Sequence, residues 1–158
     1  MLDQIKSPTP GIIEQLTGRL TTKSYNILTI FFDQATIFSY AHFQTTDSSE
    51  LTLKAKQKFE LMEQQHGVKI EAYQADNYIF QAQAWVKSFT KQSQALIFSG
   101  VNAHHENGIT ERRIRHLQDL TRMQLIHAAK RWQLYITANQ WPYTLHTTKE
   151  ITNNTPSF

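Results

Sequence analysis

The sequence predicts an α/β protein built on a mixed five-stranded sheet with helices on both faces. Three observations lead to this prediction. The segment 25–32 is apolar at nearly every position, which is typical of a strand covered on both sides. A second apolar run follows after a short turn, and strands then alternate with helices as far as residue 131. The chain of 158 residues suits one domain of this kind.

The first third of the chain is expected to form three strands. Residues 2–5 read as a very short strand, and residues 7–23, rich in Pro and Gly, read as a long loop. The strands 25–32 and 37–43 then pair as a hairpin around the loop 33–36.

A helix is expected to follow the hairpin. Asp47 or Ser48 can cap its first turn, and Gly67 can end it. Its apolar side chains recur at helical spacing and predict the buried face: Leu51, Ala55, Phe59 and Met62.

The next segments alternate between strand and helix. Residues 68–74 read as a strand that turns Val68, Ile70 and Ala72 to one side, and residues 95–98 as another strand. Between them, a helix over about 80–90 is expected to bury Phe80, Ala84 and Phe89. Trp85 is also expected to belong to the core.

The strongest helical pattern begins near Glu111. An apolar stripe predicts its packed face, toward which Glu111 is expected to lean: Ile114, Leu117, Thr121, Leu125, Ala128 and Trp132. Trp132 is thus expected in the core. A last short helix can begin at Pro142, since proline suits the first position of a helix.

Charge is concentrated in one part of the chain. The net charge is +3, but residues 107–132 alone hold six Lys or Arg against two acids, a local charge of +4. Such a basic segment is typical of a protein that binds a polyanion, and also of a solvated helix face. The absence of cysteine excludes disulfides and thiol chemistry, and the lack of a long apolar run predicts no membrane span.

Three acidic residues fall where chemistry is expected in an α/β sheet. Asp3 lies in the first strand, Asp76 follows the end of a later strand, and Glu111 opens the basic helix. Active sites of open α/β sheets gather at the carboxyl ends of strands. Clustered carboxylates repel each other unless they share a cation, and Mg²⁺ prefers such oxygen ligands. Spacing alone does not single out these three among thirteen acids.

Two motifs resemble the catalytic core of retroviral-type integrases. Asp76-Asn77 resembles the second acidic motif of that family, and the run from Asn107 through Glu111 to Arg115 resembles the third. The segments 102–108 (Asn-Ala-His-His-Glu-Asn-Gly) and 141–143 (Trp-Pro-Tyr) are similar to copia-type retrotransposon polyproteins. The resemblance extends over residues 1–158, and implies a fragment that lacks both the preceding zinc-binding module and the following reverse transcriptase.

This resemblance implies an RNase H-like fold and DNA integration. Asp3, Asp76 and Glu111 would be the catalytic residues and the ligands of two divalent ions, Mg²⁺ or Mn²⁺. Those ions would activate water or a DNA 3′-hydroxyl for attack on a phosphodiester. DNA would be the partner, held by Asn107 and by Arg112, Arg113 and Arg115. The family also implies a nuclear location, and self-association is left open.

Three alternatives stay open at this point. Asp33 competes with Asp3 for the first acidic position, because it follows the most apolar strand. Tyr78 stands where the family usually has Gly, so the chain could be an inactive retrotransposon relic that still binds nucleic acid. A nuclease acting on RNA–DNA hybrids is a third reading, which the paired integrase-like motifs oppose.

Overall fold

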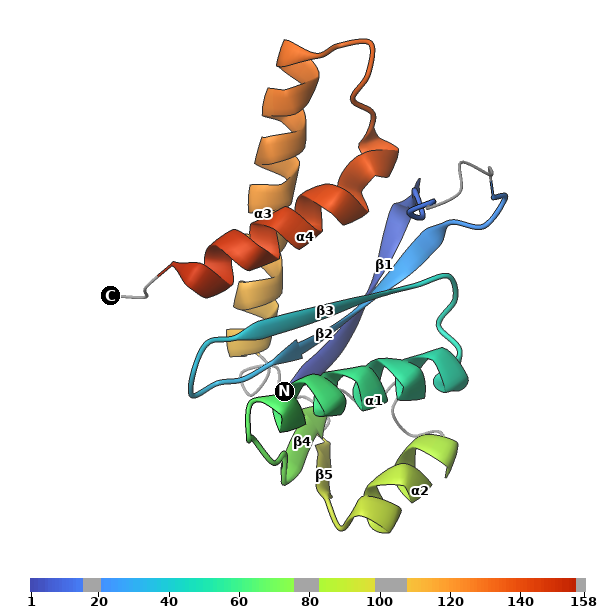
Figure 1. The fold of residues 1–158 in the computed structure, drawn as a ribbon, viewed down its shortest axis with the longest axis vertical. Helices are drawn as coiled ribbons and strands as arrows, with labels where there is room; N and C mark the ends of the chain where they lie inside the picture. Colours follow the sequence, from blue (N-terminus) through green and yellow to red (C-terminus); the bar gives the residue numbers. More distant parts are fainter. Residues whose placement is uncertain (16–20, 76–82, 99–107, 156–158) are drawn as a thin grey trace.

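The structure is a computed structural model that describes residues 1–15, 21–75, 83–98 and 108–155 (Figure 1). Within these ranges the elements, in chain order, are β1 (Leu2–Gly11), β2 (Tyr25–Phe32), β3 (Ser39–Gln44), α1 (Ser49–Gln65), β4 (Ala72–Ala75), α2 (Gln83–Gln92), β5 (Ala95–Phe98), α3 (Gly108–Arg131), the short 3-10 helix η1 (Ala138–Gln140) and α4 (Trp141–Asn154).

The five strands form one mixed sheet in the order β3-β2-β1-β4-β5. β1, β2 and β3 are antiparallel neighbours, whereas β4 runs parallel to both β1 and β5. The predicted α/β architecture with a mixed five-stranded sheet is therefore confirmed.

Helices cover both faces of this sheet, as predicted (Figure 1). α1 and α2 pack on one face around Phe31, Phe59, Tyr73 and Trp85, and α3 and α4 pack on the other around Leu28, Ile30 and Leu117. β2 is buried from Ile27 to Phe32 and contributes to both clusters. The apolar run on which the prediction was based is thus the centre of the molecule.

β1 is longer than predicted, and residues 7–11 belong to it rather than to a loop. Lys6 pairs with Ile27 and Gly11 with Tyr25, so the pairing is irregular between them. Pro8 and Pro10, which have no N–H to donate, fall within this irregular stretch. Gly11 then passes so close to α4 that an added Cβ would lie 2.8 Å from the Trp141 Nε1 atom.

The predicted ends of α1 are confirmed. The Ser48 hydroxyl accepts a hydrogen bond from the Leu51 N–H, and Gly67 adopts a φ of 75° just after the helix.

The buried face of β4 was predicted wrongly. β4 begins only at Ala72, and it buries Tyr73 and Ala75 while Ala72 and Val68 are exposed. Alternation from Val68 fits either face equally well, and the packing of Tyr73 under α1 decides which is used.

Two further packing predictions are wrong. Ala84 is exposed on α2, where Trp85 and Phe89 are buried instead. Phe80 lies outside the described residues. Trp132 is 56 % exposed just after α3, because the apolar stripe of that helix continues past the part that the sheet and α4 cover.

A buried ion pair within α1 is hydrogen-bonded to β4 and to the segment between α2 and β5. Lys56 is 1 % exposed and its Nζ lies 2.7 Å from Glu60 Oε1. Glu60 also accepts hydrogen bonds from Tyr73 Oη (3.1 Å) and Gln94 Nε2 (2.6 Å). Burial raises the pKa of Glu60, but Lys56 and these donors outweigh it and hold that pKa below its usual value.

We predict that Glu60→Gln lowers the free energy of unfolding by about 3 kcal/mol at neutral pH, because it leaves the buried Lys56 ammonium without its counter-charge. The loss is measured by urea denaturation. Since the pKa of Glu60 is lowered in the folded state, the difference in unfolding free energy between the wild type and Glu60→Gln should shrink as the pH falls below 4.5, the ordinary pKa of Glu.

The matched control is Glu50→Gln. Glu50 forms the same i,i+4 pair with Lys54, but both side chains are more than half exposed. Little change in stability is expected, because water screens exposed pairs. Equal effects of the two substitutions would contradict a special role for the buried pair.

Candidate functional site

Asp3 lies on β1 and faces the α3–α4 side of the sheet. It pairs with Ile30 of β2, whose side chain belongs to the cluster under α3 and α4. Its neighbours Leu2 and Gln4 point to the opposite face, where Gln4 Nε2 donates to Thr52 of α1. The Asp3 carboxylate is half-buried, and its Oδ1 accepts a hydrogen bond of 2.6 Å from the Gln4 N–H.

The start of α3 meets the start of β1 on this same side. The buried Thr110 hydroxyl lies 2.8 Å from the Met1 sulfur, two residues before Asp3. Glu111 follows Thr110 in the first turn of the helix. Asp3 and Glu111, which are 108 positions apart in the sequence, are therefore carried by two segments in direct contact.

Glu111 does not lean toward the packed face as expected. Its side chain is exposed, and Thr110 and Ile114 occupy the buried positions of the first turns. A carboxylate in the first turn of a helix is favoured by the helix dipole, so Glu111 needs no packing to be stable there. Its exposure leaves it accessible from solvent.

Asp76 lies outside the described residues, so its distance from Asp3 is not tested. The strand that precedes it is described: Ala75 is the last residue of β4 and pairs with Leu2 in the parallel register. The end of β4 therefore lies beside the start of β1. Among the described residues, no three His, Asp or Glu side chains are grouped closely enough to hold a metal ion.

Asp33, the rival first acid, also lies at this end of the β1–β2 pair, where the amino group of Met1 donates to the Phe32 carbonyl. It caps the hairpin turn by accepting hydrogen bonds from the N–H groups of Ala35 and Thr36. Burial raises the pKa of Asp33, but these bonds, the Thr36 hydroxyl and the Met1 amino group together lower it. Asp33 thus has a structural role in the turn.

The three arginines after Glu111 are in different environments. Arg113 is half-buried, and its guanidinium donates to the Ser39 hydroxyl and the Ile37 carbonyl (both 3.2 Å), which ties α3 to the β2–β3 hairpin. Burial lowers the pKa of Arg113. Arg112 and Arg115 are exposed. Asn107 lies outside the described residues.

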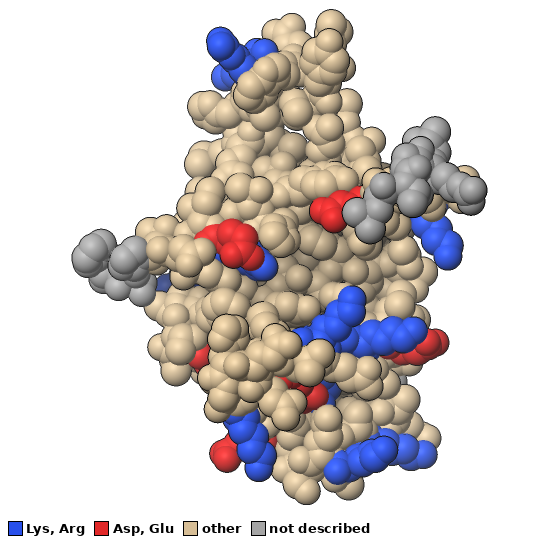
Figure 2. All heavy atoms as spheres, in the orientation of Figure 1, with Lys and Arg blue, Asp and Glu red and all other residues tan. Residues whose placement is uncertain are grey.

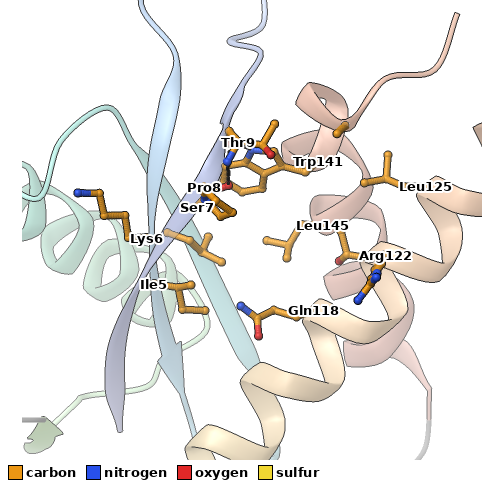
Figure 3. Close-up of a pocket in the computed structure, with 13 residues that line it drawn as sticks. Ile5, Lys6, Ser7, Pro8, Thr9, Gln118, Arg122, Leu125, Trp141 and Leu145 are labelled. Atoms are coloured by element: carbon orange, nitrogen blue, oxygen red, sulfur yellow. Dashed lines mark hydrogen bonds between the residues drawn. The ribbon is translucent and has the colours of Figure 1, made fainter.

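A cavity of about 410 Å³ opens between β1, α3 and α4, and the sequence did not indicate it (Figure 3). Ile5, Leu125, Trp141 and Leu145 make it largely apolar, and Gln118 and Arg122 line its α3 side. Neither Asp3 nor Glu111 lines it. This cavity is therefore a separate feature from the Asp3 and Glu111 side chains.

No protein-family model and no curated protein sequence matches this chain. Solved structures do match it. The catalytic core domain of BIV integrase superposes with a TM-score of 0.61 at 10% identity, over 99% of this chain and 85% of that one. The HTLV-2 integrase catalytic core domain, in complex with magnesium in a trimeric form, superposes with a TM-score of 0.64 at 12% identity. That match covers 99% of this chain and 86% of the HTLV-2 chain.

A third match is a chain of the simian T-cell lymphotropic virus intasome, in complex with PP2A regulatory subunit B56 gamma. It gives a TM-score of 0.57 at 10% identity, over 99% of this chain and 55% of that one. At such identities the likeness shows the fold alone. The chain thus has the RNase H-like fold of the retroviral integrase catalytic cores, as its sequence motifs led us to expect.

Proposed function

We propose that this protein cleaves and joins DNA strands by metal-dependent chemistry at phosphodiesters, with Asp3, Asp76 and Glu111 as the catalytic carboxylates. The observation that carries the proposal is the meeting of three segments at one end of the sheet. Thr110 contacts Met1, and Ala75 pairs with Leu2, so the residues next to all three acids come together. Asp76 follows Ala75 directly in the sequence.

Asp3 is our choice for the first acid, for two reasons. It faces α3, whose first turn carries Glu111, and it lies one residue beyond the Leu2–Ala75 pair. The two carboxylate oxygens of Asp33 accept hydrogen bonds from the N–H groups of its own turn. A metal ligand at Asp33 would have to give up those bonds.

The donor set suits hard divalent cations. Carboxylate oxygens are the ligands that Mg²⁺ and Mn²⁺ accept most readily, and an exposed Glu111 leaves room for waters and a phosphate. Two such ions, when bound, would stabilise the attacking and leaving oxygens at phosphorus. The magnesium in the HTLV-2 structure supports this choice of cofactor.

DNA is the proposed substrate, and Arg112 and Arg115 its phosphate contacts. Arg115 is four residues after Glu111, on the same side of α3, and both arginines are exposed. The Arg113 guanidinium donates hydrogen bonds to the β2–β3 hairpin and so stabilises the fold. A DNA contact by Arg113 is nevertheless part of the proposal. Asn107, one residue before α3, completes the proposed set.

The wider setting rests on the sequence motifs and on the neighbours. A copia-type origin, a catalytic core that spans residues 1–158 and a nuclear location are proposals from the resemblance. The trimeric form of the HTLV-2 core and the intasome of the simian virus support self-association as a further proposal. No helix within the described part of the chain is long and apolar enough to cross a membrane.

The first prediction of this proposal concerns Glu111→Gln. We expect it to abolish nicking of supercoiled plasmid in Mn²⁺ and to reduce the rise in melting temperature that Mg²⁺ or Mn²⁺ gives to the wild type. Glutamine keeps the shape but removes the charge that a hard cation needs. Without metal, the melting temperature should stay the same, because the exposed side chain is not part of the core.

Asp119→Asn is the matched control, since Asp119 is an exposed acid on the same helix, two turns further on. It should leave both nicking and the metal-dependent shift intact. A wild type that shows neither nicking nor a metal shift, yet still binds DNA, would contradict the enzyme and favour the inactive relic.

A second prediction separates the arginines. Arg112→Ala with Arg115→Ala should make DNA affinity less dependent on salt, lowering the slope of log K against log salt by roughly 2, because two phosphate contacts are lost. Stability should not change. Arg113→Ala should lower the melting temperature instead, because it frees the Ile37 carbonyl and the Ser39 hydroxyl. An unchanged slope in the double variant would make Arg112 and Arg115 solvated surface charges.

A further inference from the structure

The turn that follows α3 exposes three large apolar side chains. Trp132 is 56 % exposed, Leu134 89 % and Tyr135 75 %. Together with Lys130 and Arg131 they form what we call the α3 tip, residues 130–135. In Figure 1, α3 runs well beyond the end of the sheet, so the tip lies at the extremity of the molecule. Two aromatic rings placed there contribute little to the core.

The backbone of the α3 tip is held by a network of hydrogen bonds. The Trp132 N–H donates to the Ala128 carbonyl, and the N–H groups of Tyr135 and Ile136 donate to the Trp132 carbonyl at 3.0 and 3.1 Å. Gln140 Nε2 donates to the Tyr135 carbonyl at 3.1 Å. The two rings are therefore displayed on an ordered turn, which lowers the entropic cost of binding through them.

The charge around the α3 tip has one sign. Lys130 and Arg131 are exposed, and the sequence has no Asp or Glu between Asp119 and Glu150. Figure 2 shows the same on the face in view, where Lys and Arg but no acidic side chain occupy the upper end of the molecule. A partner for this surface must therefore be negatively charged and offer flat apolar groups.

We propose that the α3 tip is a binding site for single-stranded nucleic acid, in which bases stack on Trp132 and Tyr135 while Lys130 and Arg131 contact phosphates. Every base presents a flat face, so such a site binds without sequence preference. The inference rests on the proposed function only for the class of partner, and it needs no metal ion.

Two other occupants fit less well. A second copy of the chain placed tip to tip would bring Lys130 and Arg131 against their own equivalents, and like charges at an interface cost free energy. An anionic membrane would match the charge, but the tip offers only three apolar side chains for insertion. Both occupants are outcomes of the test below.

The experiment measures binding of a fluorescein-labelled oligo(dT) by anisotropy, in EDTA. Trp132→Ala should weaken binding about tenfold, because the stacking of one base is lost. Tyr135→Ala should weaken it as well. In the wild type, unlabelled oligo(dT) should quench tryptophan emission, and the signal will report Trp132 because Trp85 and Trp141 are buried.

Met123→Ala is the matched control, since Met123 is 54 % exposed on α3 but lies outside the tip. It should bind as the wild type does. Unchanged affinity in Trp132→Ala overturns the proposal. The proposal is also overturned if the protein binds phosphatidylserine vesicles but not oligo(dT), and Trp132→Ala and Leu134→Ala abolish the vesicle binding. A dimer in sedimentation that Trp132→Ala dissociates would overturn it as well. Because EDTA is present throughout, none of these results depends on the metal-dependent activity tested through Glu111.

Discussion

The burial of β2 on both faces is the constraint on which the rest of the structure depends. Phe31 contacts the cluster beneath α1 and α2, while Leu28 and Ile30 contact the cluster beneath α3 and α4. Each such side chain left exposed would cost about 1.5–3 kcal/mol. Helices must therefore cover both faces, and the helix that covers Ile30 brings its first turn to the start of β1. The contact between the first turn of α3 and the start of β1 therefore follows from a packing requirement.

The sequence predicts an element well where its local pattern and its tertiary environment agree. β2 and α1 are such cases. The continuous apolar run of β2 is buried as predicted, and the Ser48 cap and the glycine Gly67 mark the two ends of α1. β1 and β4 are not such cases. Pro8 and Pro10 usually end a strand, but irregular pairing with β2 accommodates them. The alternation after Gly67 can begin on either face, and the choice depends on Tyr73 packing beneath α1, where it donates to Glu60, thirteen positions earlier.

For the candidate site, the sequence supplies candidate residues but not the surroundings of their side chains. Arg112, Arg113 and Arg115 look alike in sequence. The burial of Thr110 and Ile114 fixes the rotation of α3, and this rotation turns Arg113 toward Ile37 and Ser39. The same rotation exposes Glu111, which the stripe had suggested would lean inward. How far the sheet extends beneath a helix is likewise invisible in a sequence. Trp132 continues the apolar stripe, but its side chain is 56 % exposed.

Under the two proposals, the two halves of α3 serve different ends of one ligand. Its first half is packed on the sheet and carries Glu111, and its second half projects and ends at the α3 tip. Twenty-one residues separate Glu111 from Trp132, which is about 31 Å at 1.5 Å per residue. Because a continuous helix fixes this distance, a strand held at the tip would present its phosphates to Glu111 at a constant separation. Weak contacts at both ends would then reinforce each other, since the second forms at high effective concentration once the first has formed.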